Sequence, residues 1–286
     1  MKQNVSLPAV DSSPRIGSCQ RFPDNLPPEI EYEIFTLAFY NDKKGGASLL
    51  RVAERVSKWL IPLLYKVVII ADPPHQQPYP PIERLQQHGH HVRHLLVSST
   101  PCPIAEEIFL SACPNVSDLA FWSGAKNIAQ VLSLSITRLQ FEDTDFVGAK
   151  LWDLPKTPQI QQWCSCITHV VLGSYLDDTN CAHNLNVLTL LPSLSHFMTF
   201  CWNEAPVIRG ILVHCPQLKV FVWLWGKCNA EDLTQVVEGR DECPVDDPRI
   251  VTLNGSYVSD WIRGAQGEDD LWILAEREIR RKGGDI

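Results

Sequence analysis

The sequence predicts an α/β fold in which a small N-terminal helical head precedes an irregular repeat of strand and helix units with parallel strands. Amphipathic helical spacing is concentrated in residues 25–65, and six strand-like strings recur through the rest of the 286 residues. With 25 Lys and Arg against 33 Asp and Glu, the net charge is −8, and no basic stripe is present. Nucleic acid is therefore not an expected partner.

The rest of the sequence predicts neither a membrane-spanning segment nor an oxidising compartment. No apolar stretch approaches the roughly 20 residues that cross a bilayer, so we expect no membrane contact. Residues 1–24 are polar and lack the apolar stretch of a secretory signal, which predicts a disordered arm. The ten cysteines are scattered without a C-x-x-C motif, which favours a reducing, cytoplasmic and/or nuclear setting.

The head begins with a predicted helix after Leu26-Pro27-Pro28. Proline is tolerated in a first turn because the N–H that it lacks has no intrahelical partner. Ile30, Ile34 and Leu37 then recur at helical spacing. A polar loop is expected over residues 41–46.

A second helix is predicted to begin at Ser48 as its N-cap and to end at Pro62. A short third element is expected over residues 63–65. A unit of this size is too small to be stable alone, so it needs a neighbour.

The strings LPPEIEYEIFTLAF and LLRVAERVSKWLIPLLYKVVII resemble an F-box, in particular the F-box-like heads of fungal proteins. Their most specific elements are the Leu26-Pro27 pair and the run from Val56 to Trp59, which matches the family's valine-serine-basic-tryptophan run. The resemblance implies that residues 25–65 bind the Skp-family adaptor of a cullin ubiquitin ligase. The implied adaptor-binding residues are Leu26, Pro27, Ile30, Ile34, Val52, Val56 and Trp59.

Two observations qualify this interpretation. The stretch 41–47 is glycine-rich and lacks the usual Asp-Leu entry to the second helix of the family. The same apolar spacing is also that of any helical hairpin, so these residues have the alternative role of burying the helices against the rest of the chain.

Six strings after the head align as apolar-x-x-apolar-x-apolar, and Thr199 breaks the last position of the fifth. They are VRHLLVS from Val92, VSDLAFW from Val116, ITRLQFE from Ile136, ITHVVLG from Ile167, LSHFMTF from Leu194 and LKVFVWL from Leu218. Their composition is typical of strands. Helices are predicted between them, several of which end just before a proline. These helices are Ile104–Cys113, Asn127–Leu134, Asn184–Leu191 and Pro206–Cys215.

This cysteine-proline-leucine phrasing resembles the leucine-rich repeats of F-box proteins. The resemblance implies that residues 66–286 form an irregular solenoid with parallel strands on one face and helices on the other. We expect a long loop over residues 143–162 and a last strand over 249–253. A helix between Asp269 and Lys282 is expected to cap the open end of the solenoid.

Side chains alternate along a strand, so Leu218, Phe221 and Trp223 are expected in the core. The opposite, outward positions are unusually apolar, which predicts a groove that binds a target protein. The predicted target-binding residues are Trp122, Met198, Phe200, Val222 and Leu224. The alternative is that insertions or the C-terminal segment cover this face.

No catalytic motif is present, and we expect no catalytic residue, no cofactor and no metal. A cluster at His88, His90, His91 and His94 lacks acidic or cysteine partners at a standard spacing and is interpreted as a solvated loop. Cys164 and Cys166 near His169 are interpreted as buried repeat cysteines rather than a thiolate and its base.

The leading hypothesis is a substrate-receptor subunit of a Skp/cullin/F-box (SCF) ubiquitin ligase, with the adaptor on the head and an unknown target on the repeats. The alternative is a repeat protein that binds a partner without any ligase. A small hydrolase or transferase on an α/β sheet is a third possibility, which requires a deep pocket with polar residues converging at strand ends.

Overall fold

The computed structural model describes residues 26–70, 82–97, 103–121, 128–141, 157–173, 188–200, 205–225, 235–236 and 243–284. The predicted arm lies outside these ranges. The chain divides into two compact units, residues 1–60 and 61–286, with the division inside a helix. The two units are described separately, as the head and the repeat unit.

The head consists of α1 (Pro28–Asn41), α2 (Lys43–Leu49) and the first part of α3 (Glu54–Leu64). Helix α1 begins at the predicted proline. The predicted polar loop is wrong, because α2 occupies it with Asp42 as the N-cap: the Asp42 side chain accepts a hydrogen bond from the Gly45 N–H at 2.9 Å. Ser48 is no N-cap; its hydroxyl donates to the Gly45 carbonyl.

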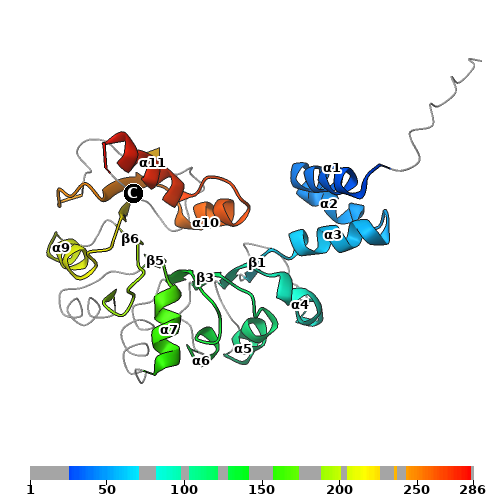
Figure 1. Cartoon of the computed structure of the whole chain (residues 1–286), viewed down its shortest axis with the longest axis horizontal. Coiled ribbons are helices and arrows are strands. Elements are labelled where there is room, and N and C mark those ends of the chain that lie inside the picture. The colour runs from blue at the N-terminus through cyan, green and yellow to red at the C-terminus, as the bar shows by residue number, and fades with distance from the viewer. Residues whose placement is uncertain are drawn as a thin grey trace, which may run out of the picture. The chain divides into compact units, whose positions relative to one another are not determined.

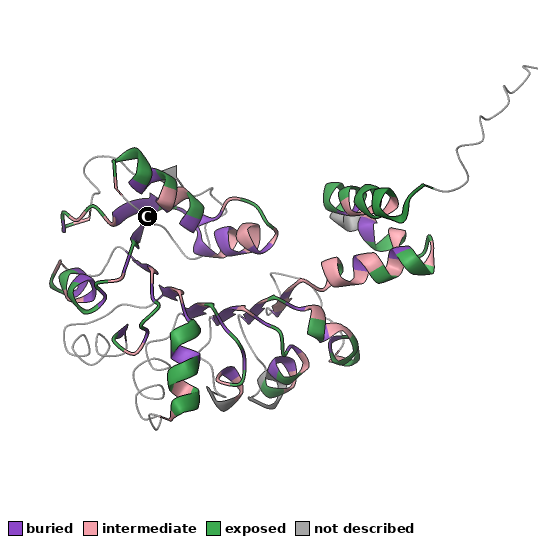
Figure 2. Ribbon diagram, in the orientation of Figure 1, coloured by how far each residue is buried: buried purple, intermediate pink, exposed green. Residues whose placement is uncertain are grey.

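The second predicted helix begins later and ends later than expected, since α3 starts at Glu54 and contains Pro62. Gly46 explains how a short helix fits beside α1. A Cβ at this position would lie 2.7 Å from Cδ2 of Phe39, so glycine leaves the room that the buried Phe39 ring occupies against α2. The buried large apolar residues described in the three helices are Phe39, Val56 and Leu60. Most of α1 is coloured as exposed or intermediate in Figure 2.

The repeat unit is built on one nine-stranded sheet in the described residues, with the order β1-β2-β3-β4-β5-β6-β7-β9-β8. Strands β1 to β7 and β9 are parallel and β8 is antiparallel to β9. The strands are β1 (Val67–Ile70), β2 (His94–Val97), β3 (Asp118–Phe121), β4 (Arg138–Phe141), β5 (His169–Leu172), β6 (His196–Phe200), β7 (Val220–Trp225), β8 (Gln235–Val236) and β9 (Ile250–Asn254).

The prediction of an α/β fold with parallel strands is confirmed. Each of the six aligned strings contains one strand, β2 to β7, and the predicted last strand is β9. Strand β1 was not predicted, because its sequence lies within the string that resembles an F-box. The sheet is open rather than closed.

Helices form a layer on the outer side of the curved sheet (Figure 1). They are α4 (Ile82–His88), the 3-10 helix η1 (Gly89–His91), α5 (Pro103–Ala112), α6 (Ile128–Val131), α7 (Pro158–Cys166) and α9 (Ala205–His214). The predicted helices at α5 and α9 are confirmed and α6 is shorter than predicted. Helix α7 begins inside the predicted loop 143–162, and the predicted helix 184–191 lies largely outside the described residues.

The same side-chain hydrogen bond recurs just before four successive strands, β3 to β6. Ser117, Thr137, Thr168 and Ser195 each occupy the second position of an aligned string. Each hydroxyl donates to the carbonyl of the second-position residue in the preceding repeat, at 3.1–3.3 Å. These bonds fasten neighbouring turns at the same register and supplement the backbone ladder.

The outer core lies between the sheet and the helical layer. It contains the predicted core residues Leu218, Phe221 and Trp223, and the cysteines of both Cys-Pro turns, Cys113 and Cys215. Burial raises the pKa of Cys113 to about 12 and that of Cys215 to about 11. These thiols serve as small apolar groups.

The opposite, inner face of the sheet is covered by α10 (Tyr257–Ala265) and α11 (Leu271–Arg281), which lie inside the curve of the strands (Figure 1). We refer to residues 257–281 as the clasp. The Asp270 side chain caps α11 by accepting from the Trp272 and Ile273 N–H groups. The predicted helix is therefore correct, whereas its predicted place at the end of the solenoid is wrong: its apolar side packs on the sheet face.

One prediction follows from the packing of η1 against α5. A Cβ on Gly89 would overlap the backbone oxygen of Ala112, which cannot move as a side chain can. We expect Gly89→Ala to lower the free energy of unfolding by about 1–3 kcal/mol through overpacking, measured by urea denaturation of the full chain. Ser111→Ala on the exposed side of α5 is the control and should cost less than about 0.5 kcal/mol. Equal stabilities would contradict the packing argument.

Candidate functional site

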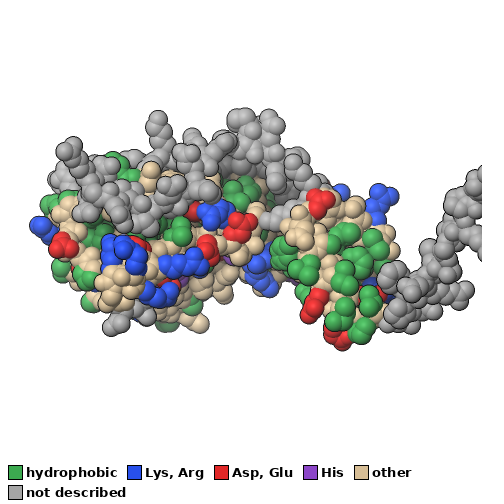
Figure 3. Space-filling model, turned by 90° about the horizontal axis from the view of Figure 1, so that it is seen from above, with side chains coloured by type: hydrophobic (Ala, Val, Ile, Leu, Met, Phe, Trp, Pro, Cys, Tyr) green, Lys and Arg blue, Asp and Glu red, His purple; other side chains and the backbone are tan. Residues whose placement is uncertain are grey.

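An exposed apolar surface lies on the head. It is formed by Leu26, Ile30, Ile34, Leu37 and Val52, whose exposed fractions are 44%, 43%, 48%, 62% and 60%. We call these five residues the head apolar surface. Hydrophobic side chains gather on the head in the view of Figure 3.

The local sequence explains why this surface stays exposed. Ile30, Ile34 and Leu37 follow one another at spacings of four and three and so share one side of α1. Helix α1 contributes only Phe39 to the buried residues of the head, which leaves this stripe uncovered. Arg55 of α3 is 2.7 Å from a carboxylate oxygen of Glu31 and ties the two helices together.

The contrast with the rest of the chain is marked. Seven of the ten exposed large hydrophobic residues in the described ranges belong to the head. The other three belong to the repeat unit and lie on three different helices: Leu64 at the end of α3, Val213 on α9 and Ile273 on α11. Scattered exposed apolar residues are ordinary, whereas a gathered patch is typical of a contact site.

The structure divides the seven predicted adaptor-binding residues into two groups. Leu26, Pro27, Ile30, Ile34 and Val52 are exposed. Val56 is 1% exposed, so its prediction as a contact residue is wrong and it belongs to the core of the head. Trp59 is half-buried, and its ring lies edge-on to Tyr32 at 5.9 Å between centroids.

Sequence reasoning missed Leu37 as part of the head apolar surface. Its signal was present, because it continues the helical spacing of Ile30 and Ile34. Nothing in the spacing distinguished it from a residue that packs inside the unit.

The predicted target-binding groove is wrong. Met198, Phe200, Val222 and Leu224 are all 0% exposed, because α11 and Tyr257 pack over them. Trp122 lies outside the described residues. The alternative that the C-terminal segment covers this face is confirmed.

A polar row crosses the inner face beside these apolar residues. Five consecutive strands, β2 to β6, begin at the same register with His94, Asp118, Arg138, His169 and His196. The sequence analysis did not predict this row, although the third position of the first five aligned strings is a charged residue or a histidine in each case.

The polar row holds the clasp by specific contacts. Asp118 accepts from the indole N–H of Trp261 at 2.8 Å and lies 3.2 Å from His94 Nδ1. Arg138 donates to Asp270 Oδ2 at 3.0 Å. His196 Nε2 lies 3.1 Å from Glu276 Oε1.

A cavity of about 10 Å³ remains between the polar row and the clasp, lined in part by Asp118, Arg138, Gln140 and Asp260. The Gln140 Oε1 atom is buried there without a hydrogen-bond partner. This volume is about that of one water molecule, so the cavity is too small for a substrate.

The other clusters considered in the sequence do not form a chemical site. No three His, Cys, Asp or Glu residues within the described ranges are placed to hold a metal ion. His94 belongs to the polar row, and the rings of His90 and His91 lie together at 3.8 Å between centroids. Cys164 is in the outer core and His169 is beneath α11, so they are on opposite sides of the sheet. Burial raises the pKa of Cys164, while Cys166 is exposed.

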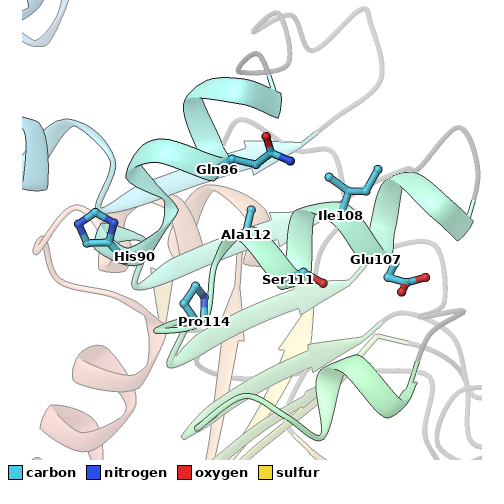
Figure 4. A pocket seen from close by; sticks show the side chains of 7 residues that line it. All are labelled: Gln86, His90, Glu107, Ile108, Ser111, Ala112 and Pro114. Atoms are coloured by element: carbon cyan, nitrogen blue, oxygen red, sulfur yellow. The ribbon is translucent and has the colours of Figure 1, made fainter.

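A surface pocket of about 630 Å³ lies between α4 and α5 (Figure 4). Its polar lining includes Gln86, His90, Glu107 and Ser111. In Figure 4 the His90 and Glu107 side chains stand at opposite ends of the pocket. A ligand site normally has polar groups that converge, so this arrangement gives no support to the hydrolase or transferase hypothesis.

No protein-family model matches the chain, and a search of curated proteins found no match either. Across the described ranges, no helix combines the length and apolar character needed to cross a membrane.

Two valines of the head provide a matched test of this division into surface and core. Val56→Ala removes buried methyl groups, so we expect the free energy of opening of the head to fall by about 1.5–3 kcal/mol. Val52→Ala is the same change at a 60% exposed position and should shift it by less than about 0.5 kcal/mol. Native-state hydrogen exchange of α1 and α3 measures both, and a larger effect at Val52 would contradict the assignment.

Proposed function

We propose that this protein is a substrate-receptor subunit of an SCF-type ubiquitin ligase whose head binds a Skp-family adaptor. The observation that carries the proposal is the exposure of five of the seven residues implied by the F-box resemblance: Leu26, Pro27, Ile30, Ile34 and Val52. Ile30 and Ile34 lie one turn apart on α1, and all five residues belong to a unit that is compact by itself.

The physical basis is helix recognition by an apolar surface. A stripe at i, i+4 and i+7 on α1 is the pattern with which an amphipathic helix binds a hydrophobic groove or partner helix. Burying a large aliphatic side chain contributes about 1.5–3 kcal/mol, so a few such anchors supply the free energy of a specific complex after the costs of association.

The repeat unit is proposed to be an irregular, leucine-rich-repeat-like solenoid that holds the target. Support comes from parallel strands that neighbour one another in chain order and from the hydroxyl hydrogen bonds that repeat between them. While the clasp covers the inner face, the apolar strand residues there are not accessible to a target. The subunit would act through proximity, by raising the effective concentration of a target lysine near the conjugating enzyme.

The proposal is tested by co-purification of the recombinant chain with a Skp-family adaptor. Ile34→Asp places a charge on the exposed stripe of α1 without replacing a buried residue. We expect the dissociation constant to rise at least about 100-fold, which corresponds to about 2.7 kcal/mol.

Val213→Asp is the matched control, because it introduces the same charge at a 75% exposed apolar position of the repeat unit. It should bind the adaptor as the wild type does. Circular dichroism verifies that both variants fold. A folded wild type that does not bind would replace the ligase proposal by the alternative of a repeat protein that binds a partner without a ligase.

A further inference from the structure

Two histidines of the polar row are stacked beneath the clasp. The rings of His169 on β5 and His196 on β6 lie 4.1 Å apart between centroids, at an angle of 11°. Trp272 of α11 contacts both rings edge-on, at 5.3 and 5.6 Å. The Nδ1 atoms are 2.8 Å from the hydroxyls of Thr168 and Ser195. Docking of α11 therefore places an indole on a closely stacked imidazole pair.

Charged groups surround this pair from each neighbouring element. Arg138 on β4 disfavours a positive charge on either ring, and Lys219, at the start of β7, disfavours one on His196. From α11, Glu276 favours a charge on His196, while its other oxygen pairs with Arg280.

Two further acids come from the clasp. Asp270, at the start of α11, pairs with Arg138, and Asp260 on α10 pairs with Arg263. His169 itself has no acidic partner among these groups.

We propose that the clasp is a pH-gated element, which docks on the inner face while His169 and His196 are neutral and is released as they become protonated. Two imidazolium rings cannot remain stacked and buried beside Arg138, because burial and like charges both disfavour the charged forms. Release frees the rings to take up protons in water and uncovers the apolar strand residues beneath α11.

The direction of the pH dependence follows from the cause of each shift. Burial, with the charges of His196 and Arg138, lowers the pKa of His169 to about 2, and burial also lowers that of His196. A histidine that stays neutral in the docked state leaves docking at its full strength well above its ordinary pKa of about 6.5. Below that pKa the open state binds a proton that the docked state does not, so docking weakens progressively as the pH falls. Between pH 7.5 and pH 5, His169 alone should increase the opening constant about 30-fold.

Asp260 acts in the opposite direction. Burial raises its pKa to about 6, so the docked clasp takes up a proton there as the pH falls. Over the same interval Asp260 should decrease the opening constant about tenfold. The two groups can therefore be separated by substitution.

The test is hydrogen exchange of the full chain at pH 7.5 and pH 5, with protection factors corrected for intrinsic exchange. In the wild type, the protection of α11 amides should fall by about 3-fold or more between the two pH values, while amides of α5 and α9 keep theirs. Asp260→Asn should make the fall about tenfold larger. His169→Phe removes the roughly 30-fold contribution of His169, so the protection of α11 should no longer fall and should instead rise as Asp260 takes up its proton. His196→Gln should reduce the fall.

His214→Gln on α9 is the control variant, because His214 is exposed and its Nδ1 atom bonds to the Gly210 carbonyl of the same helix. It should respond to pH as the wild type does. If His169→Phe does not fold, a nuclear magnetic resonance titration of the wild-type His169 ring replaces it, and the ring should stay neutral at pH 5 while α11 is docked.

Three results would overturn the proposal. One is an unchanged pH response in folded His169→Phe, and another is equal loss of protection in α5, α9 and α11, which indicates global acid unfolding. The third is a His169 ring that titrates near pH 6.5 in the docked state.

Discussion

Burial of both faces of the parallel sheet is the constraint on which the repeat unit depends. Strand β7 is apolar at every position, and β6 carries Phe197 on one face and Met198 and Phe200 on the other, so each of their faces requires cover. The outer helices, which the chain forms between successive strands, cover one face. The other face has no local source of cover, and the last two helices of the chain supply it. The clasp is therefore the long-range contact that completes the fold.

The contacts of the clasp change in character along the sheet. Over β7 and β9 the contacts are apolar, with Leu271, Ala275 and Ile279 packed on the strands. Over β2 to β6 the clasp also meets the polar row, through the indoles of Trp261 and Trp272 and through Glu276. Apolar contacts are insensitive to pH, whereas buried histidines and carboxylates respond to it. One end of the covered face thus supplies anchorage and the other can respond to protonation.

With the sheet covered, the apolar surface left open among the described residues is on the head. This separation explains why only some of the residues implied by the F-box resemblance are exposed. Helical spacing identifies the side of α1 that carries Ile30 and Ile34, but spacing on α3 is shared by a core residue, Val56, and by an exposed one on the approach to that helix, Val52. Which of the two valines is exposed depends on how α1 and α2 pack against α3, and only the tertiary structure gives that packing.

The sequence by itself determined the strands β2 to β7 and β9, the helices α5, α9 and α11 and the parallel arrangement, because these follow from local apolar spacing and from prolines that end helices. It contained the polar row as well, at the third position of five strings. Only the tertiary structure decided that α10 and α11 cover the inner face, that α2 replaces a loop and that the target-binding residues are buried. These outcomes depend on contacts between segments far apart in the chain, such as Trp261 with Asp118 and Trp272 with His169. An apolar pattern indicates that a face of the sheet must be covered, but it does not indicate which segment covers it.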